Sequence, residues 1–296
     1  MSDNARKQLG ALRYGLPARV WRRAVVTGGI CAAGLIAVYL LAVWTPAGQR
    51  FEDAVLRGAT GSTDGARATS ALDRISAPTL ILAIAVVLSI GFLRRKPLLG
   101  FLGAGVVVAS VATAEVIQRS VQRPILLQHG YRREDQSFPS GHAAVAMSVM
   151  CALVMVTPYR FRGVVLLATS VGATAVEVAT VSASWHRPSD AVGSDLIVLV
   201  YVCVAAAVLA RYGWIAEAGA SGRLARTLLA TGYGGVALVA LAVAVAAAGH
   251  GSAFLAGRAL ALCGSAAVAL ALLALLRGVD LSTAVSAPTK DRELAW

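Results

Sequence analysis

The sequence predicts an all-α, polytopic helical membrane protein, and three observations carry that prediction. Only 14% of the 296 residues are charged and 57% are hydrophobic, whereas about a quarter of the residues in a soluble domain are charged. The mean hydropathy is +0.71. Apolar runs of about 20 residues, long enough to cross roughly 30 Å of hydrocarbon, recur along the chain. We expect eight spans, at residues 24–44, 75–93, 98–117, 141–156, 163–182, 191–209, 227–248 and 254–276.

The first apolar run follows a basic segment, residues 1–23, which is also the polarity of a signal peptide. The apolar region of a signal peptide is usually about 7–15 residues long and ends in small residues at a cleavage site. This run is longer and ends Val43-Trp44-Thr45-Pro46. We therefore expect an uncleaved first span with Trp44 at the membrane interface. The charge-balanced loop that follows, residues 45–74, contains a stretch at 51–56 that suits a short helix on the membrane surface.

The later spans are separated by short polar turns, and the last two spans contain little besides Ala, Val and Leu. Those two are expected to be accessory packing helices. The predicted organisation is a cytoplasmic basic segment (1–23), a membrane core (24–210), accessory transmembrane helices (211–276) and a cytoplasmic tail (277–296).

The net charge of +12 is explained by topology. Cytoplasmic loops are enriched in Lys and Arg, and with a cytoplasmic N-terminus the inside segments 1–23, 94–97, 157–162, 210–226 and the tail are all basic. No nucleic-acid motif accompanies the charge, so nucleic acid is not an expected partner. The expected location is the plasma (inner) membrane. The outer loop 118–139 departs from the rule, and either an anionic ligand or lipid headgroups account for its four arginines, Arg119, Arg123, Arg132 and Arg133.

Two polar clusters lie at the expected outer face. In the first, Pro139 followed by Ser140 is typical of a helix start with Ser140 as N-cap. The N–H groups and dipole of a helix N-terminus attract anions, and Gly141 lets an anion approach the backbone closely. Arg123 adds a fork that recognises phosphate. Together these residues predict a phosphate cradle.

The second cluster runs from Trp185 to Asp190. His142 and His186 can divide the chemistry between a nucleophile and an acid for the leaving oxygen. Asp190, four residues after His186, can hold the other imidazole nitrogen and fix its tautomer. A zinc site on these side chains is the weaker alternative, because the neighbouring arginine opposes a cation. His129 and His250 have no such companions and are expected to be surface residues.

The order of these motifs, Arg-Pro at 123–124, Pro-Ser-Gly-His at 139–142 and His-x-x-x-Asp at 186–190, resembles the type-2 phosphatidic acid phosphatase superfamily. The resemblance covers about residues 75–210. It implies a six-helix phosphatase core, here with two extra C-terminal spans, and a site at the outer membrane surface that requires no metal or cofactor.

The resemblance also implies roles. His186 would attack phosphorus and form a phosphohistidine, Asp190 would orient His186, and His142 would protonate the leaving group. The groups that would bind the phosphoryl oxygens are Arg123, Ser140 and the Gly141 amide. The implied substrate is a lipid phosphomonoester or diphosphate, such as phosphatidic acid or a polyprenyl diphosphate.

Two positions depart from the family pattern. Val116 stands where a Lys is usual, seven residues before Arg123, and Thr180 stands where an Arg is usual, six residues before His186. Arg119 is the preferred substitute, because four residues separate it from Arg123 on one expected helix face. Arg187 and the loop arginines are other candidates. The alternative function is therefore a non-catalytic or altered protein of the same fold that binds lipid phosphates. Glu115 and Glu177 are intramembrane acids, which either pair with these arginines or lie at the lipid edge.

Overall fold

The chain is almost entirely helical in the computed structural model, which describes residues 3–60, 64–127, 136–218 and 223–281. This confirms the predicted all-α class. The α-helices are α1 (Asp3–Val38), α2 (Pro46–Thr60), α3 (Gly65–Leu72), α4 (Ala77–Leu93), α5 (Pro97–Ser120), α6 (Gly141–Val156), α7 (Arg162–Ser182), α8 (Pro188–Arg211), α9 (Arg223–Gly249) and α10 (Ala253–Leu275). The remaining elements are a π-helical turn η1 (Tyr39–Val43), a 3-10 turn η2 (Tyr159–Phe161) and the strands β1 (Ala216–Glu217) and β2 (Val279–Asp280).

Each of the eight expected spans coincides with an apolar helix. Within the described residues, six helices are long and apolar enough to cross a membrane, and α3 with α4 would make a seventh if this pair, bent by 59°, is one span. The eighth, α6, has only 16 residues, which is about 24 Å at 1.5 Å per residue. The protein is therefore a multi-pass membrane protein.

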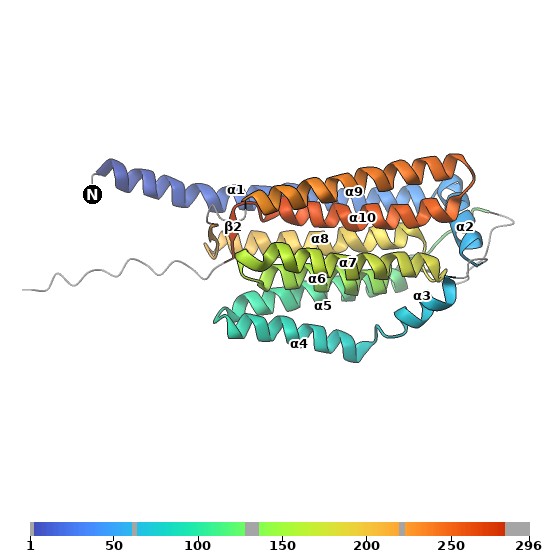
Figure 1. Ribbon diagram of the computed structural model, residues 1–296, viewed down its shortest axis with the longest axis horizontal. Coiled ribbons are helices and arrows are strands. Elements are labelled where there is room, and N and C mark those ends of the chain that lie inside the picture. Colours follow the sequence, from blue (N-terminus) through green and yellow to red (C-terminus); the bar gives the residue numbers. More distant parts are fainter. Residues whose placement is uncertain (1–2, 61–63, 128–135, 219–222, 282–296) are drawn as a thin grey trace, which may run out of the picture.

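The long helices run side by side along the bundle, and α2 lies across one end of it (Figure 1). The short helix α6 is central, because it packs against α4, α5, α7 and α8. Its methionines Met147, Met150 and Met155 are fully buried. Thioether side chains fill irregular gaps between helices, so α6 is surrounded by protein and positions whatever its N-terminus carries.

The last helix, α10, is packed into the bundle, with contacts to α2, α7 and α8 as well as to its hairpin partner α9. The first helix, α1, packs along α8. The basic N-terminal segment continues into this helix, which begins at Asp3, and the part suited to cross a membrane is Gly15–Val43.

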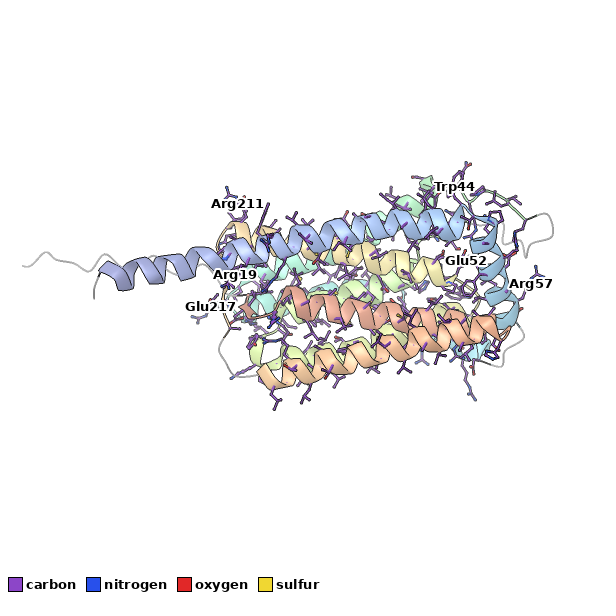
Figure 2. The ribbon with its side chains drawn as sticks, turned by 90° about the horizontal axis from the view of Figure 1, so that it is seen from above. Arg19, Trp44, Glu52, Arg57, Arg211 and Glu217 are labelled. Carbon is purple, nitrogen blue, oxygen red and sulfur yellow. The ribbon has the colours of Figure 1, made fainter. Side chains whose placement is uncertain are left out.

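Different labelled residues mark the two ends of the bundle (Figure 2). Arg19, Arg211 and Glu217 mark one end, and Trp44, Glu52 and Arg57 mark the other, where α2 lies. At the first end β1 pairs antiparallel with β2, which joins the segment after α8 to the segment after α10. The stretch at 51–56 is helical as expected, but it is part of the longer helix α2. This helix buries one side, including Glu52 and Asp53, against the bundle.

Candidate active site

The first turns of α6 and α8 are joined at the end of the bundle where α2 lies. Ser140 caps α6, as its side-chain oxygen accepts a hydrogen bond from the Ala143 N–H at 3.3 Å. The Ser140 N–H donates to the Asp190 carbonyl at 3.0 Å. The Ser194 hydroxyl donates to the Ser140 carbonyl at 2.6 Å. These bonds hold the two helix starts, and therefore the two polar clusters, against one another.

The space in front of Gly141 is open. A Cβ atom added to Gly141 would meet no heavy atom within 4 Å, so a ligand can approach the start of α6 closely. Gly193 on α8 is the opposite case, because an added Cβ would lie 2.7 Å from the ring of Phe138. Phe138 is buried and its ring centroid is 5.4 Å from that of Tyr39. The Phe138–Pro139 peptide bond is cis.

The His186 ring is held at one nitrogen. Its Nδ1 lies 3.2 Å from the Ser137 carbonyl oxygen and 3.5 Å from the Asp190 Oδ2. Both partners only accept hydrogen bonds, because a carboxylate and a carbonyl have no proton to give. Nδ1 therefore carries the proton, which leaves a free lone pair on Nε2. Asp190 is held in turn, since its Oδ2 accepts the Arg187 N–H at 2.8 Å.

His142 lies beside His186, with 6.2 Å between the ring centroids. Its ring also contacts Trp185 edge to face, with centroids 5.4 Å apart. Acid–base groups work at about 2.6–3.2 Å from the atoms they serve. Two imidazoles at this separation can both touch one group that lies between them. The structure thus brings together the predicted nucleophile, its orienting acid and the predicted proton donor.

Ser137, just before the first cluster, connects several of these side chains. Its carbonyl contacts His186 and accepts a bond from the Gln118 Nε2 at 3.5 Å. Its hydroxyl accepts a hydrogen bond from the Arg187 Nη1 at 2.7 Å. Arg187 is buried, so its side chain does not extend into solvent.

Helix α2 adds a carboxylate to the arginine side of the site. Glu52, 2% exposed, forms an ion pair with Arg123 and accepts a hydrogen bond from Ser189. The Glu52 Oε2 also lies 4.0 Å from the Arg187 Nε. Arg123 has an Nη1 atom, and Arg187 an Nε atom, that are buried and make no hydrogen bond to any described residue. Both guanidinium groups therefore keep one N–H donor that no described residue accepts.

The segment that carries Arg123 is held by α2 and η1. The Gln49 amide nitrogen donates to the Pro124 carbonyl at 2.7 Å, and its oxygen accepts from the Leu126 N–H at 3.3 Å. The Tyr39 hydroxyl donates to the Gln122 carbonyl at 3.2 Å. These contacts fix a stretch of chain that is neither helix nor strand, because α5 ends at Ser120.

Burial dominates the electrostatics of this corner. It raises the pKa of Glu52 above the ordinary value, and the attraction of Arg123 opposes this effect. It lowers the pKa of Arg187, an effect that the neighbouring Arg123 increases and Asp190 and Glu52 oppose. Glu52 is therefore easier to protonate than an exposed carboxylate, so the charge at this corner is easier to change.

The expected substitute Arg119 is not brought to this group. Its side chain is 76% exposed and forms an ion pair with Glu115 at 2.8 Å. The expectation that it shares a helix face with Arg123 is wrong, because α5 ends between the two residues. A role for Arg119 in phosphate binding stays a prediction. Arg132, Arg133 and His129 lie outside the described residues.

Neither departure from the family pattern leaves an empty place in the site. Val116 is 62% exposed, so its side chain faces away from the bundle. Thr180 is buried, and its hydroxyl donates to the Glu177 carbonyl of its own helix at 2.7 Å. Glu177 pairs with no arginine among the described residues. It accepts a hydrogen bond from Ser265 and lies within hydrogen-bonding reach of Asp195, between α7, α8 and α10.

Sequence reasoning missed three residues of the site. Glu52 lies in the charge-balanced segment 45–74, which was expected to be a loop and which gave no signal of its own. Ser137 acts partly through its carbonyl, which every residue has. Gln118 is a neutral residue near the end of a span, and only the direction of its side chain places it at Ser137.

The comparisons with known proteins agree with the motifs. The family model for the PAP2 superfamily matches residues 104–214, a stretch that runs from α5 past the end of α8 and carries both histidines. This confirms the resemblance to type-2 phosphatidic acid phosphatases. The match leaves α1 to α4, α9 and α10 outside, and with them Glu52. No curated protein and no solved structure matches the chain.

Proposed function

We propose, from the match to the PAP2 superfamily, that this membrane protein hydrolyses a lipid phosphomonoester or diphosphate through a phosphohistidine intermediate. The family implies phosphatase-type activity on phosphate esters. The more specific proposal rests on the pair His142 and His186. Their ring centroids are 6.2 Å apart, and the His186 Nδ1 is held by two hydrogen-bond acceptors. Binding alone requires neither a positioned nucleophile nor an acid beside it.

In the first step the His186 Nε2 attacks phosphorus in line with the bond to the leaving oxygen. The P–O bond breaks as the P–N bond forms, and the leaving oxygen takes a proton from His142. Positive charge grows on the His186 ring, and the Asp190 carboxylate, 3.5 Å from Nδ1, stabilises it. The lipid alcohol, or the lipid monophosphate if the substrate is a diphosphate, then departs.

In the second step a water molecule attacks the phosphohistidine and gives a proton to His142. The P–N bond breaks, inorganic phosphate leaves, and both histidines return to their starting states. The phosphoryl oxygens would be held by the Arg123 donor, the start of α6 and the open space at Gly141. No metal or cofactor enters either step.

We propose that the site serves the outer leaflet of the plasma membrane. Arg19 and Arg211 mark the end of the bundle away from α2 (Figure 2), and such residues gather on the cytoplasmic side. That assignment puts α2 and the site at the extracytoplasmic surface, where a lipid phosphate is presented.

The decisive experiment measures inorganic phosphate release by purified full-length protein across a panel of lipid phosphomonoesters and diphosphates. His186→Ala should abolish release. His250→Ala is the matched control, because His250 is exposed just after α9 and its Nδ1 lies 2.7 Å from the Ala246 carbonyl oxygen. Equal release by the His186 variant and wild type would refute the proposal.

One observation favours the second candidate, a protein that binds lipid phosphates without hydrolysing them. Arg123 is already engaged by Glu52, and Val116 and Thr180 supply no cation. The same panel separates the two, because this candidate requires lipid binding without phosphate release from any member.

A further inference from the structure

The end of the bundle away from α2 contains a cavity of about 470 Å³ that the proposed reaction does not use. Apolar residues of α7, α9 and α10 line it, among them Val164, Leu167, Leu228, Leu229 and Leu272. Val164 is 69% and Leu228 is 62% exposed, so in a membrane the sides of this cavity face lipid. The volume falls within the roughly 300–1,000 Å³ of ordinary ligand sites.

Three arginines line the same cavity: Arg160, Arg162 and Arg226. They lie near the start of α7 or the start of α9, so they gather at one end of an otherwise apolar space. Arg226 donates to the Tyr159 hydroxyl at 3.1 Å, and the Arg160 guanidinium lies 4.5 Å from the Phe161 ring centroid. These contacts position the two guanidinium groups but do not neutralise them.

Arg162 gives a second, independent observation that points to a ligand in this cavity. It is 6% exposed, and one nitrogen, Nη1, donates to the Val279 carbonyl at 2.8 Å. Its Nε and Nη2 atoms are buried and have no hydrogen-bond partner among the described residues. Buried donors of a charged group are costly to leave unpaired. The Asp280 carboxylate acts on Arg162 from nearby but forms no ion pair with it in the described part of the chain.

The geometry points to a binding site for an anionic phospholipid from the leaflet at this end of the bundle. The headgroup phosphate would lie at Arg160, Arg162 and Arg226, and one acyl chain would lie between α7, α9 and α10. Three guanidinium groups against one carboxylate give the positive charge that an anionic headgroup requires, and basic pockets between transmembrane helices are known to take such headgroups. With the orientation proposed above, this leaflet is the cytoplasmic one.

The test is lipid binding to the purified full-length protein, measured by native mass spectrometry with phosphatidylglycerol as the probe. Its headgroup is a phosphodiester, so it is no substrate for the proposed phosphomonoesterase. Arg226→Gln and Arg160→Gln should each weaken binding about fivefold, the effect of one basic residue at a lipid surface. Arg211→Gln is the matched control, because Arg211 is exposed at the same end but does not line the cavity.

A third variant separates a built site from simple surface attraction. Ala225→Phe places a ring in the cavity and keeps all three arginines, so it should also weaken phosphatidylglycerol binding. Equal binding of phosphatidylcholine, unchanged binding in Ala225→Phe, or binding of inorganic phosphate as tight as that of phosphatidylglycerol would overturn the proposal. His186→Ala should bind the probe as wild type does, so this proposal and the proposed function fail independently.

Discussion

Replacing Asp190 with Asn tests the proposed chemistry at its most buried charge. The Asp190 Oδ2 lies 3.5 Å from the His186 Nδ1, and the side chain is fully buried. Asn has almost the same shape, and the Ser137 carbonyl still accepts from Nδ1. The substitution should therefore keep the ring in place while it removes the negative charge that faces it.

The expected size of the effect follows from the distance. When the His186 ring gains a positive charge during attack, a carboxylate at 3.5 Å stabilises it by about 5 kcal/mol at an effective dielectric constant of roughly 20. Each 1.36 kcal/mol is a factor of ten in rate. We expect kcat/KM for phosphate release to fall about a thousandfold or somewhat more, with the change mainly in kcat, because the charge develops only in the transition state.

The assay is phosphate release by wild type and Asp190→Asn, with thermal unfolding of both proteins in the same detergent. Asp195→Asn is the matched control. Asp195 is buried five residues further along α8, but it lies against Glu177 and Gly264 and makes no contact with either histidine. A folded Asp190→Asn protein that keeps more than a tenth of the wild-type kcat/KM would refute the reasoning, as would an equal loss in the control.

Two further predictions concern Glu52 and Gly141, which lie beside the expected position of the phosphate. Glu52→Gln should bind inorganic phosphate severalfold more tightly at neutral pH, because it removes a negative charge beside Arg123. Burial raises the Glu52 pKa above 4.5. The contribution of this group to the free energy of unfolding is therefore full below pH 4.5 and is lost as the pH rises through the folded-state pKa. Unfolding measured across pH should show that loss in wild type and not in Glu52→Gln. Gly141→Ala should keep wild-type stability and raise KM, since its methyl group enters open space where the phosphate would lie. Gly193→Ala should lower the unfolding temperature, because its methyl group would meet the Phe138 ring at 2.7 Å; equal stability of the two alanine variants would contradict both assignments.

The fold was predictable because membrane spans are read from composition and length, which are local properties. All eight expected spans coincide with helices, and the bounds of α6 were predicted to the residue because Ser140 caps one end and Thr157-Pro158 closes the other. The start of α1 was placed too late, since a polar, basic sequence can continue a helix beyond the membrane. The packing of α10 into the bundle was not predictable, because an Ala- and Leu-rich helix has no face that identifies its neighbours.

The site also contains residues that the sequence could indicate and residues that it could not. His142, His186 and Asp190 could be singled out from the sequence because their expected roles depend on side-chain type and on short spacings at the start of α6 or of α8. Glu52 was not found, because its contact with Arg123 joins residues 71 positions apart and depends on the path of α2 across the end of the bundle. Ser137 was not found because a backbone carbonyl leaves no mark in a sequence.

Helix geometry indicates which position of α5 could supply the missing cation. Residues of an α-helix turn about 100° each, so the side chains at 116 and 118 point about 160° apart, on nearly opposite faces. Val116 is exposed, whereas Gln118 reaches the Ser137 carbonyl beside His186. The seven positions between Val116 and Arg123 extend past the end of α5 at Ser120. The chain after Ser120 is not helical, so the helical period does not determine where the Arg123 side chain points. We therefore predict that a cation would help at position 118.

A gain of function is expected from a cation at position 118. Gln118→Lys should place an ammonium group near the histidines and raise kcat/KM for phosphate release by about tenfold or more, since a single donor to the phosphoryl oxygens is worth roughly a hundredfold or more in other sites. Val116→Lys is the matched control on the same helix, and it should leave phosphate release unchanged because its side chain faces away from the bundle. A gain in the Val116 variant, or none in a folded Gln118 variant, would show that the cradle is closed by other groups.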